Sequence, residues 1–143
     1  MIGMNQKYYE ICAGAIPVYK NKFVLLYDRK KNHYVLPQGH KRKNEPLLNT
    51  ALRETKEETG FQELIPVKKL GKYQYHFKQG KKIVYKTIHV YLIKISSNKR
   101  LRNTQKANEN FKAYPFFFKD AVKIVKWKQD KKYIKLAKRF LVI

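Results

Sequence analysis

The segment GHKRKNEPLLNTALRETKEETGF, residues 39–61, constrains the fold of this chain more than any other stretch. Four of the ten acidic residues lie in it: Glu45, Glu54, Glu57 and Glu58. The rest of the chain is dominated by its 33 Lys and Arg, which give the 143 residues a formal net charge of +23. Because like charges this close on a helix repel each other, we expect a positive group to lie among the glutamates.

The same segment predicts a helix over residues 46–59. Asn44 is a favourable cap, Pro46 is tolerated in a first helical turn, and Gly60 is a typical residue just past a helix end. At about 100° per residue, one side of this helix carries small and aliphatic residues. These residues, predicted to be buried, are Leu48, Ala51, Leu52, Thr55 and Thr59.

The adjoining side of the predicted helix carries Glu54, Glu57 and Glu58 at i,i+3 and i,i+4 spacing. One interpretation is a solvated helix face on which Arg53, Lys56 and the glutamates form surface pairs. The other is an oxygen-ligand set for a hard divalent cation such as Mg²⁺, which would relieve the repulsion and attract phosphates.

The complete spacing of the segment is G-x5-E-x7-R-E-x-x-E-E-x-G-[apolar]. Its defined positions are filled by Gly39, Glu45, Arg53, Glu54, Glu57, Glu58, Gly60 and Phe61. This pattern resembles the signature of the Nudix hydrolases, which cleave nucleoside diphosphates linked to another moiety. One position departs from it, since Thr55 stands where the family usually has an aliphatic residue. The resemblance implies a hydrolase of phosphoanhydride bonds.

The resemblance also implies roles for individual residues. In the family, the glutamates matching Glu54, Glu57 and Glu58 bind Mg²⁺ or Mn²⁺, and the carbonyl matching Gly39 assists them. The arginine matching Arg53 orients these side chains and pairs with the residue matching Glu45, as a bidentate guanidinium fork can. The general base differs between members, and the candidates here are Glu57 and Glu109.

Three stretches outside this segment are similar to asymmetrical diadenosine tetraphosphate (Ap4A) hydrolases. They are HYVLPQGH, the Tyr-rich YQYHFKQGKKIVYKTIHVYL and the C-terminal FFFKDAVKIVKWKQDKKYIKLAKRFL. This similarity implies cleavage of Ap4A to ATP and AMP by water attack on phosphorus. It makes His33, His40 and Lys86 candidates for phosphate contacts. Tyr75 and Tyr114 are candidates for stacking on a base.

Two alternatives to a dinucleotide hydrolase stay open. Gln38 and Tyr34 replace the Lys and Trp usual in that subgroup, and PQG also resembles bacterial enzymes that remove pyrophosphate from RNA 5′ ends. A wide basic surface favours RNA through counterion release, and SSNKRLRNTQK with the lysines of the last helix would supply one. An inactive Nudix module that binds nucleotide or RNA is the third possibility. The lysine excess can also reflect an AT-rich genome.

The remaining sequence predicts a single Nudix domain over residues 1–143, of α+β class, an α/β/α sandwich with a mixed sheet between helices. Residues 10–18 and 23–28 predict one hairpin, and residues 72–79 and 82–95 another. Residues 111–118 predict a strand near an edge, because it contains Pro115. Residues 96–110 predict a mobile loop, and residues 118–126 and 128–142 predict helices, the last with an apolar stripe of Tyr133, Leu136, Ala137 and Phe140.

The single Cys12 excludes an internal disulfide and is predicted to be a small core residue. No apolar run approaches the length needed to span a bilayer, and the N-terminus lacks the apolar region of a signal peptide. We therefore expect a cytoplasmic location and no membrane partner. The sequence gives no indication of the oligomeric state.

Overall fold

The computed structural model describes residues 6–101 and 110–141, which form a mixed sheet and three helices. The strands are β1 (Gln6–Tyr19), β2 (Lys22–Asp28), β3 (His33–Val35), β4 (Gln38–His40), β5 (Leu64–Gln79), β6 (Lys82–Ile95) and β7 (Phe111–Phe116). The helices are α1 (Leu47–Thr59), α2 (Phe118–Ile124) and α3 (Lys128–Lys138).

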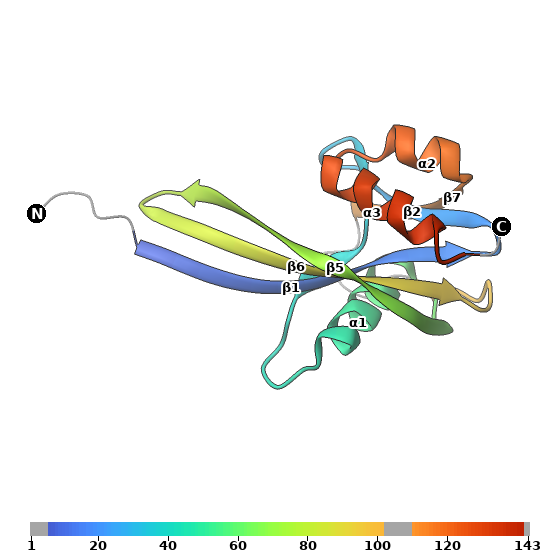
Figure 1. Ribbon diagram of the computed structural model, residues 1–143, viewed down its shortest axis with the longest axis horizontal. Helices are drawn as coiled ribbons and strands as arrows, with labels where there is room; N and C mark the ends of the chain where they lie inside the picture. The colour runs from blue at the N-terminus through green and yellow to red at the C-terminus, as the bar shows by residue number, and fades with distance from the viewer. Residues whose placement is uncertain (1–5, 102–109, 142–143) are drawn as a thin grey trace, which may run out of the picture.

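The sheet has seven described strands with the central order β3-β2-β1-β6-β5, while β4 pairs with β1 and β7 with β2. β1 and β6 run parallel along their whole length, and the other pairs are antiparallel. α1 lies on one face of the sheet, and α2 and α3 lie on the other (Figure 1). The prediction of an α+β sandwich with a mixed sheet between helices is confirmed.

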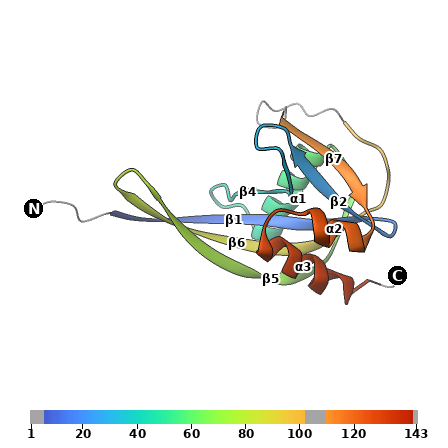
Figure 2. The ribbon, with the colours of Figure 1, turned by 90° about the horizontal axis from the view of Figure 1, so that it is seen from above.

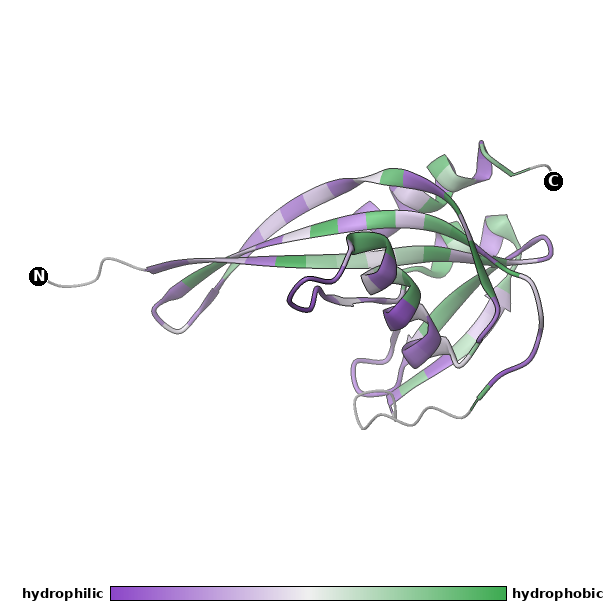
Figure 3. Cartoon of the chain, turned by 90° about the horizontal axis from the view of Figure 1, so that it is seen from below, coloured by the Kyte–Doolittle hydropathy of each residue, from purple (hydrophilic) through white to green (hydrophobic). Residues whose placement is uncertain are grey.

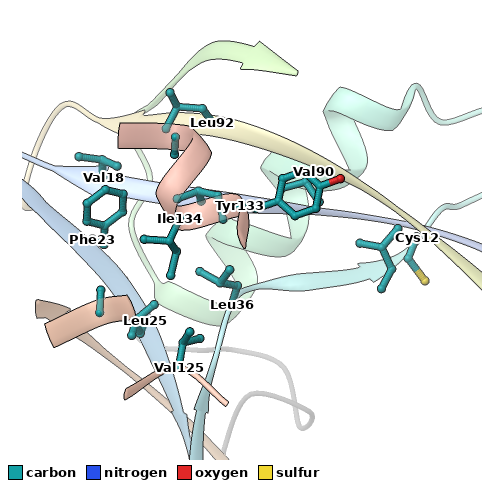
Figure 4. Close-up of a cluster of buried hydrophobic side chains, with 14 residues drawn as sticks. Cys12, Val18, Phe23, Leu25, Leu36, Val90, Leu92, Val125, Tyr133 and Ile134 are labelled. Atoms are coloured by element: carbon teal, nitrogen blue, oxygen red, sulfur yellow. The ribbon is translucent and has the colours of Figure 1, made fainter. Parts of the chain in front are cut away.

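Each face of the sheet has its own core. Under α2 and α3, buried side chains of the sheet such as Phe23, Leu25 and Leu92 pack against Ile134 and Val125 (Figure 4). Cys12 belongs to this cluster and is fully buried, as predicted. Under α1 the core is made of small residues, Ala13 and Ala15 of β1 and Ala51 of the helix, with Ile93 of β6. Small side chains allow the helix and the sheet to approach closely.

Both predicted hairpins are present, with Val18 opposite Phe23 in the first and Gln79 opposite Lys82 in the second. The predicted starts of two strands were wrong, since β1 begins at Gln6 and β5 at Leu64. β5 forms the end of the central strand order and accommodates Pro66 and Gly71 through register shifts at Pro66/Lys68 and Lys69/Gly71.

The C-terminal helices are shorter than predicted, because α2 ends at Ile124 and α3 at Lys138. After Lys138 the hydrogen bonds span three residues instead of four, with Arg139 N–H donating to Leu136 O and Phe140 N–H to Ala137 O. Phe140 therefore leaves the predicted apolar stripe and is 44% exposed, while Ile134 is buried. Tyr133 and Ala137 are buried as predicted, and Leu136 is partly buried.

None of the helices in the described ranges is long and apolar enough to cross a membrane. Of the loop predicted at residues 96–110, residues 102–109 lie outside the described residues.

Candidate active site

Helix α1 begins and ends at defined backbone positions. Pro46 is its N-terminal flanking residue, and the Pro46 carbonyl accepts a hydrogen bond from Thr50 N–H. The prediction that Asn44 caps the helix was wrong, because Asn44 adopts a left-handed turn conformation with φ of 62°. Gly60 ends the helix as predicted, with φ of 84° and its N–H donating to Lys56 O. Only glycine adopts this conformation without steric cost.

The buried side of α1 orients the opposite, acidic side. Ala51, Thr55 and Thr59 are buried against the sheet, as the periodicity predicts. Thr55 donates its hydroxyl to the Ala51 carbonyl at 2.7 Å, and Thr59 donates to the Thr55 carbonyl at 2.6 Å. These bonds satisfy the hydroxyl groups within the helix, so threonine fits the position where the family usually has an aliphatic residue.

A bidentate ion pair joins α1 to the loop before it. Arg53 Nε lies 2.8 Å from Glu45 Oε2, and Arg53 Nη2 lies 3.0 Å from Glu45 Oε1. Glu45 also accepts hydrogen bonds from the Thr50 hydroxyl and from Arg42 N–H. Arg53 and these other donors lower the pKa of Glu45 to about 2. Glu45 is therefore ionised at neutral pH and holds Arg53 in a fixed orientation.

Arg53 is the positive group that the clustered glutamates require. Its Nη1 lies 2.7 Å from Glu54 Oε1 and 3.4 Å from Glu57 Oε2, and its Nη2 donates to the His40 carbonyl at 3.0 Å. Arg42 Nη2 also lies 3.8 Å from Glu57 Oε1. The guanidinium thus connects the loop, strand β4 and the acidic side of α1.

Glu58 is the most deeply buried carboxylate of the cluster. Its Oε1 accepts a hydrogen bond from Gln38 N–H at 2.9 Å. Burial, together with the negative charges of Glu54 and Glu57, raises the pKa of Glu58 well above its ordinary value. Burial raises the pKa of Glu54 as well. A cation bound among these carboxylates would favour their ionised forms.

Gly39 gives Glu54 the space it needs. A Cβ atom at position 39 would overlap the carboxyl group of Glu54. Gly39 lies on β4 opposite Ala13 of β1, so the sheet fixes its backbone beside α1. The Gly39 carbonyl and the Glu54 carboxylate are thereby kept in the same small region of the molecule.

The residues of this region fit a hard divalent cation by their chemistry. Within residues 6–101 and 110–141, no three His, Cys, Asp or Glu side chains converge as a preassembled metal site. The Glu54 and Glu57 oxygens are instead directed at Arg53. All the donors that the sequence predicts, Glu54, Glu57, Glu58 and the Gly39 carbonyl, are oxygens, which Mg²⁺ and Mn²⁺ prefer.

A cleft with a volume of about 590 Å³ opens beside the acidic helix. Glu58 and Gln38 border it on the α1 side, and the first residues of α3 border it on the other. Three of the predicted substrate contacts, His33, Tyr75 and Lys86, line this cleft together. They come from β3, β5 and β6, so the fold brings distant parts of the chain to one cavity.

The other predicted residues lie elsewhere. His40 and Tyr114 are not among the residues that line the cleft. The exposed ring of His40 has its Nε2 2.9 Å from Glu10 Oε1, and Tyr114 lies on β7 with its ring edge-on to Tyr34. Glu109, a candidate for the general base, lies outside the described residues.

The start of α3 contributes cleft residues that the sequence did not reveal, among them Trp127, Asp130 and Tyr133. The Trp127 ring packs edge-on against the His33 ring, with centroids 5.8 Å apart. Asp130 is buried, and this burial raises its pKa to about 7. In the sequence, only their rarity could have pointed to these residues: Trp127 is the one Trp of the chain, and Asp130 is an acidic residue among lysines.

An oxygen-rich helix beside a cleft bordered by cationic and aromatic side chains is suited to cleaving bonds between phosphates. The family model of the NUDIX domain matches residues 9–138, so the chain belongs to the Nudix hydrolase family. Members of this family are acid anhydride hydrolases, and the chain is accordingly a Nudix pyrophosphohydrolase. Nudix substrates are nucleotide pyrophosphates, and members typically use divalent metals.

Several solved structures share this fold. A crystal structure of C. elegans Ap4A hydrolase is 22% identical, with a TM-score of 0.70 over 93% of this chain and 98% of that chain. A binary complex of a C. elegans Ap4A hydrolase is 21% identical, with a TM-score of 0.72 over 92% and 96%. A NUDIX family hydrolase from Clostridium perfringens is 12% identical, with a TM-score of 0.69 over 92% and 98%. Among curated proteins, no match was found.

Proposed function

We propose that this protein hydrolyses dinucleoside polyphosphates, splitting Ap4A into ATP and AMP by water attack on phosphorus. The observation that carries this proposal is the composition of one cleft. It combines the buried carboxylate of Glu58 with cationic Lys86 and with the aromatic rings of Tyr75 and Trp127. A volume of about 590 Å³ is in the range of sites for nucleotide-sized ligands. The fold shared with C. elegans Ap4A hydrolase supports the same substrate class.

Glu54, Glu57 and Glu58, with the Gly39 carbonyl, are the residues that would hold Mg²⁺ or Mn²⁺. When bound, such a cation neutralises phosphate charge and lowers the pKa of an attacking water. Arg53 positions Glu54 and Glu57 through its contacts at 2.7 and 3.4 Å, and Glu45 in turn holds Arg53. Gln38 N–H fixes one oxygen of Glu58. Glu57 is our first candidate to accept the proton of the attacking water, and Glu109 is the second.

Hydrogen-bond donors at the rim of the cleft would bind the phosphate chain. Lys31, His33 and Lys86 line it and can donate charge-assisted hydrogen bonds to phosphate oxygens. Tyr75 and Trp127 are exposed aromatic residues in the same lining and can stack on a base. His40 and Tyr114 are expected to contribute less to substrate affinity, because they lie outside this lining.

The test is product analysis after incubation with Ap4A and Mg²⁺, with 5′-triphosphorylated RNA as a second substrate. We expect equimolar ATP and AMP. Formation of ADP alone, or turnover of RNA but not of Ap4A, would overturn the proposal.

Lys86→Gln tests the phosphate-binding role of the cleft. We expect it to raise the KM for Ap4A about tenfold with little change in kcat, because one charge-assisted hydrogen bond to substrate is lost. Lys94→Gln is the matched control, since Lys94 is an exposed lysine on the same strand, β6, and does not line the cleft. Equal KM values for the two variants would remove Lys86 from the site.

A further inference from the structure

Three strands continue beyond the body of the molecule as a protruding arm. We define the arm as residues 6–11 of β1, 73–79 of β5 and 82–87 of β6, with the turn at residues 80–81. Figures 1 and 2 show these strand ends extending well past all three helices. Tyr8, Tyr75 and Phe77 of the arm are 39%, 41% and 38% exposed. Large exposed apolar patches usually mark binding sites, so these exposed rings indicate that the arm binds a partner.

The strand register separates the side chains of the arm into two faces. Val84 of β6 lies between Tyr8 of β1 and Phe77 of β5, and one step further along Tyr85 lies between Tyr9 and His76. Successive residues of a strand point to opposite faces, so Tyr8 and Phe77 share one face and Tyr9 belongs to the other. Figure 3 shows hydrophilic and hydrophobic bands mixed along these strands, with hydrophilic residues at the tip of the arm.

One face carries a continuous row of rings that starts inside the cleft. The rings of Tyr133 and Tyr73 have centroids 5.8 Å apart, those of Tyr73 and Tyr75 6.4 Å, and those of Tyr75 and Phe77 6.1 Å. Tyr133, Tyr73 and Tyr75 line the cleft, whereas Phe77 lies beyond it on the arm. We call these four residues the aromatic row. It leads outward from the cleft.

Lysines accompany the aromatic row. Of the five in the arm and its turn, Lys82 and Lys86 share the face of Val84, Tyr8 and Phe77 by strand register, Lys81 lies in the turn, and Lys7 and Lys78, both opposite Ile83, belong to the other face. The single acidic residue of the arm, Glu10, has an oxygen 2.9 Å from His40 Nε2. Lys82 Nζ lies 4.9 Å from the centroid of the Tyr8 ring, so charge and ring are presented together. A second copy of this chain, also with a net charge of +23, would be repelled by such a surface.

We propose that the face of the arm formed by Tyr8, Tyr75 and Phe77 binds single-stranded RNA. Rings interleaved with lysines stack on bases and neutralise phosphates, and this combination is suited to an unpaired strand. A duplex would hide the base faces within its own stack. RNA is the nucleic acid that fits the neighbouring cleft, because RNA 5′ ends carry phosphoanhydride bonds, the bond class that this family hydrolyses. This inference goes beyond the dinucleotide activity proposed above and is tested by binding alone.

The experiment is fluorescence anisotropy with a labelled single-stranded oligouridine in the presence of chelator, so that no turnover occurs. We expect Phe77→Ala and Tyr8→Ala each to weaken binding about tenfold, the effect of losing one base-stacking ring. Tyr9→Ala is the matched control, because Tyr9 is 70% exposed but lies on the opposite face of the same arm. We expect its affinity to equal that of the wild type.

A second measurement addresses the charges. For a single strand, the slope of log affinity against log salt concentration changes by about 0.7 for each phosphate contact. We expect Lys82→Gln to reduce the slope by about this amount. Phe77→Leu keeps an apolar side chain without a ring and replaces Phe77→Ala in the binding assay if that variant does not fold. It too should weaken binding.

Several outcomes would overturn the proposal. They are unchanged RNA affinity in both Phe77 variants, an equal loss in Tyr9→Ala, and tighter binding of oligothymidine than of RNA. A dimer that dissociates on Phe77→Ala while RNA affinity stays the same would instead assign the arm to a second copy. Hydrolysis of Ap4A is measured in parallel, because Phe77 lies outside the cleft lining and its variants should retain wild-type turnover. Failure of the arm and failure of the proposed enzyme activity are therefore distinguishable.

Discussion

Arg53 on helix α1 donates to both carboxylate oxygens of Glu45, at 2.8 and 3.0 Å, from a position eight residues further along the chain. The same guanidinium contacts Glu54 and the His40 carbonyl. Glu45 thus influences the acidic side of α1 without belonging to the predicted ligand set. Glu45 acts on these glutamates indirectly, by orienting Arg53.

Glu45→Gln is predicted to lower kcat by about 10- to 100-fold, the usual cost of losing a residue that orients metal ligands. Arg53 would then lose its ion pair with the loop while keeping its contacts to Glu54 and Glu57, so its orientation would be less fixed. The free energy of unfolding should fall by about 1–3 kcal/mol, because the bonds to Glu45 involve charged groups. Steady-state kinetics and urea unfolding measure the two effects. The control is Glu63→Gln at an exposed glutamate, and full activity of Glu45→Gln would contradict the positioning role.

Gly39→Ala is predicted to keep the fold and lose activity. The added methyl group would overlap the flexible end of the Glu54 side chain, so Glu54 must move while the backbone stays in place. Gly80→Ala should give the opposite result. Gly80 has open space around it but a φ of 63°, so alanine there costs about 1 kcal/mol in stability and leaves Ap4A turnover intact. Melting temperatures and turnover rates of the two variants test this contrast.

Asp130→Asn is predicted to change how stability depends on pH. Burial raises the pKa of Asp130 from 3.8 to about 7, so the folded protein holds a proton that the unfolded chain releases above about pH 4. The contribution of Asp130 to the free energy of unfolding of the wild type therefore falls as pH rises from about 4 to 7. Asparagine does not titrate, and the variant should gain stability relative to the wild type over this range.

The expected gain is a few kcal/mol, since one pKa unit corresponds to about 1.4 kcal/mol. Chemical denaturation of both proteins at pH 4, 5.5, 7 and 8 measures it. A constant difference between the two proteins at all four values would show that Asp130 keeps an ordinary pKa.

The acidic helix could be predicted from the sequence because the residues that define it lie close together along the chain. The register of Ala51, Thr55 and Thr59 on one side and of the glutamates on the other follows from helical geometry alone. The two hairpins were predictable for the same reason. The role of Asn44 could not be predicted, because asparagine is favoured both at helix caps and in left-handed turns, and only the backbone conformation separates the two.

The cleft required tertiary information that the sequence does not carry. Trp127 and Asp130 reach it because α3 packs on β5, where the Tyr133 hydroxyl donates to the Lys72 carbonyl. Gly71 permits this approach, since a Cβ there would come within 2.9 Å of the Tyr133 hydroxyl. His33 and Lys86 line the cleft while His40 does not, and motif similarity could not separate these three.

The central claim is that the glutamates of α1 hold the metal on which hydrolysis depends. Its most direct test is the rate of Ap4A hydrolysis by chelator-treated protein during a Mg²⁺ titration. The variants are Glu57→Gln and, as a control on an exposed position of the same helix, Lys56→Gln. We predict no hydrolysis without metal, a saturable rise with Mg²⁺ for the wild type and Lys56→Gln, and a rate at least about 100-fold lower for a folded Glu57→Gln. Wild-type rates from Glu57→Gln, or hydrolysis of Ap4A in the presence of excess chelator, would contradict the claim.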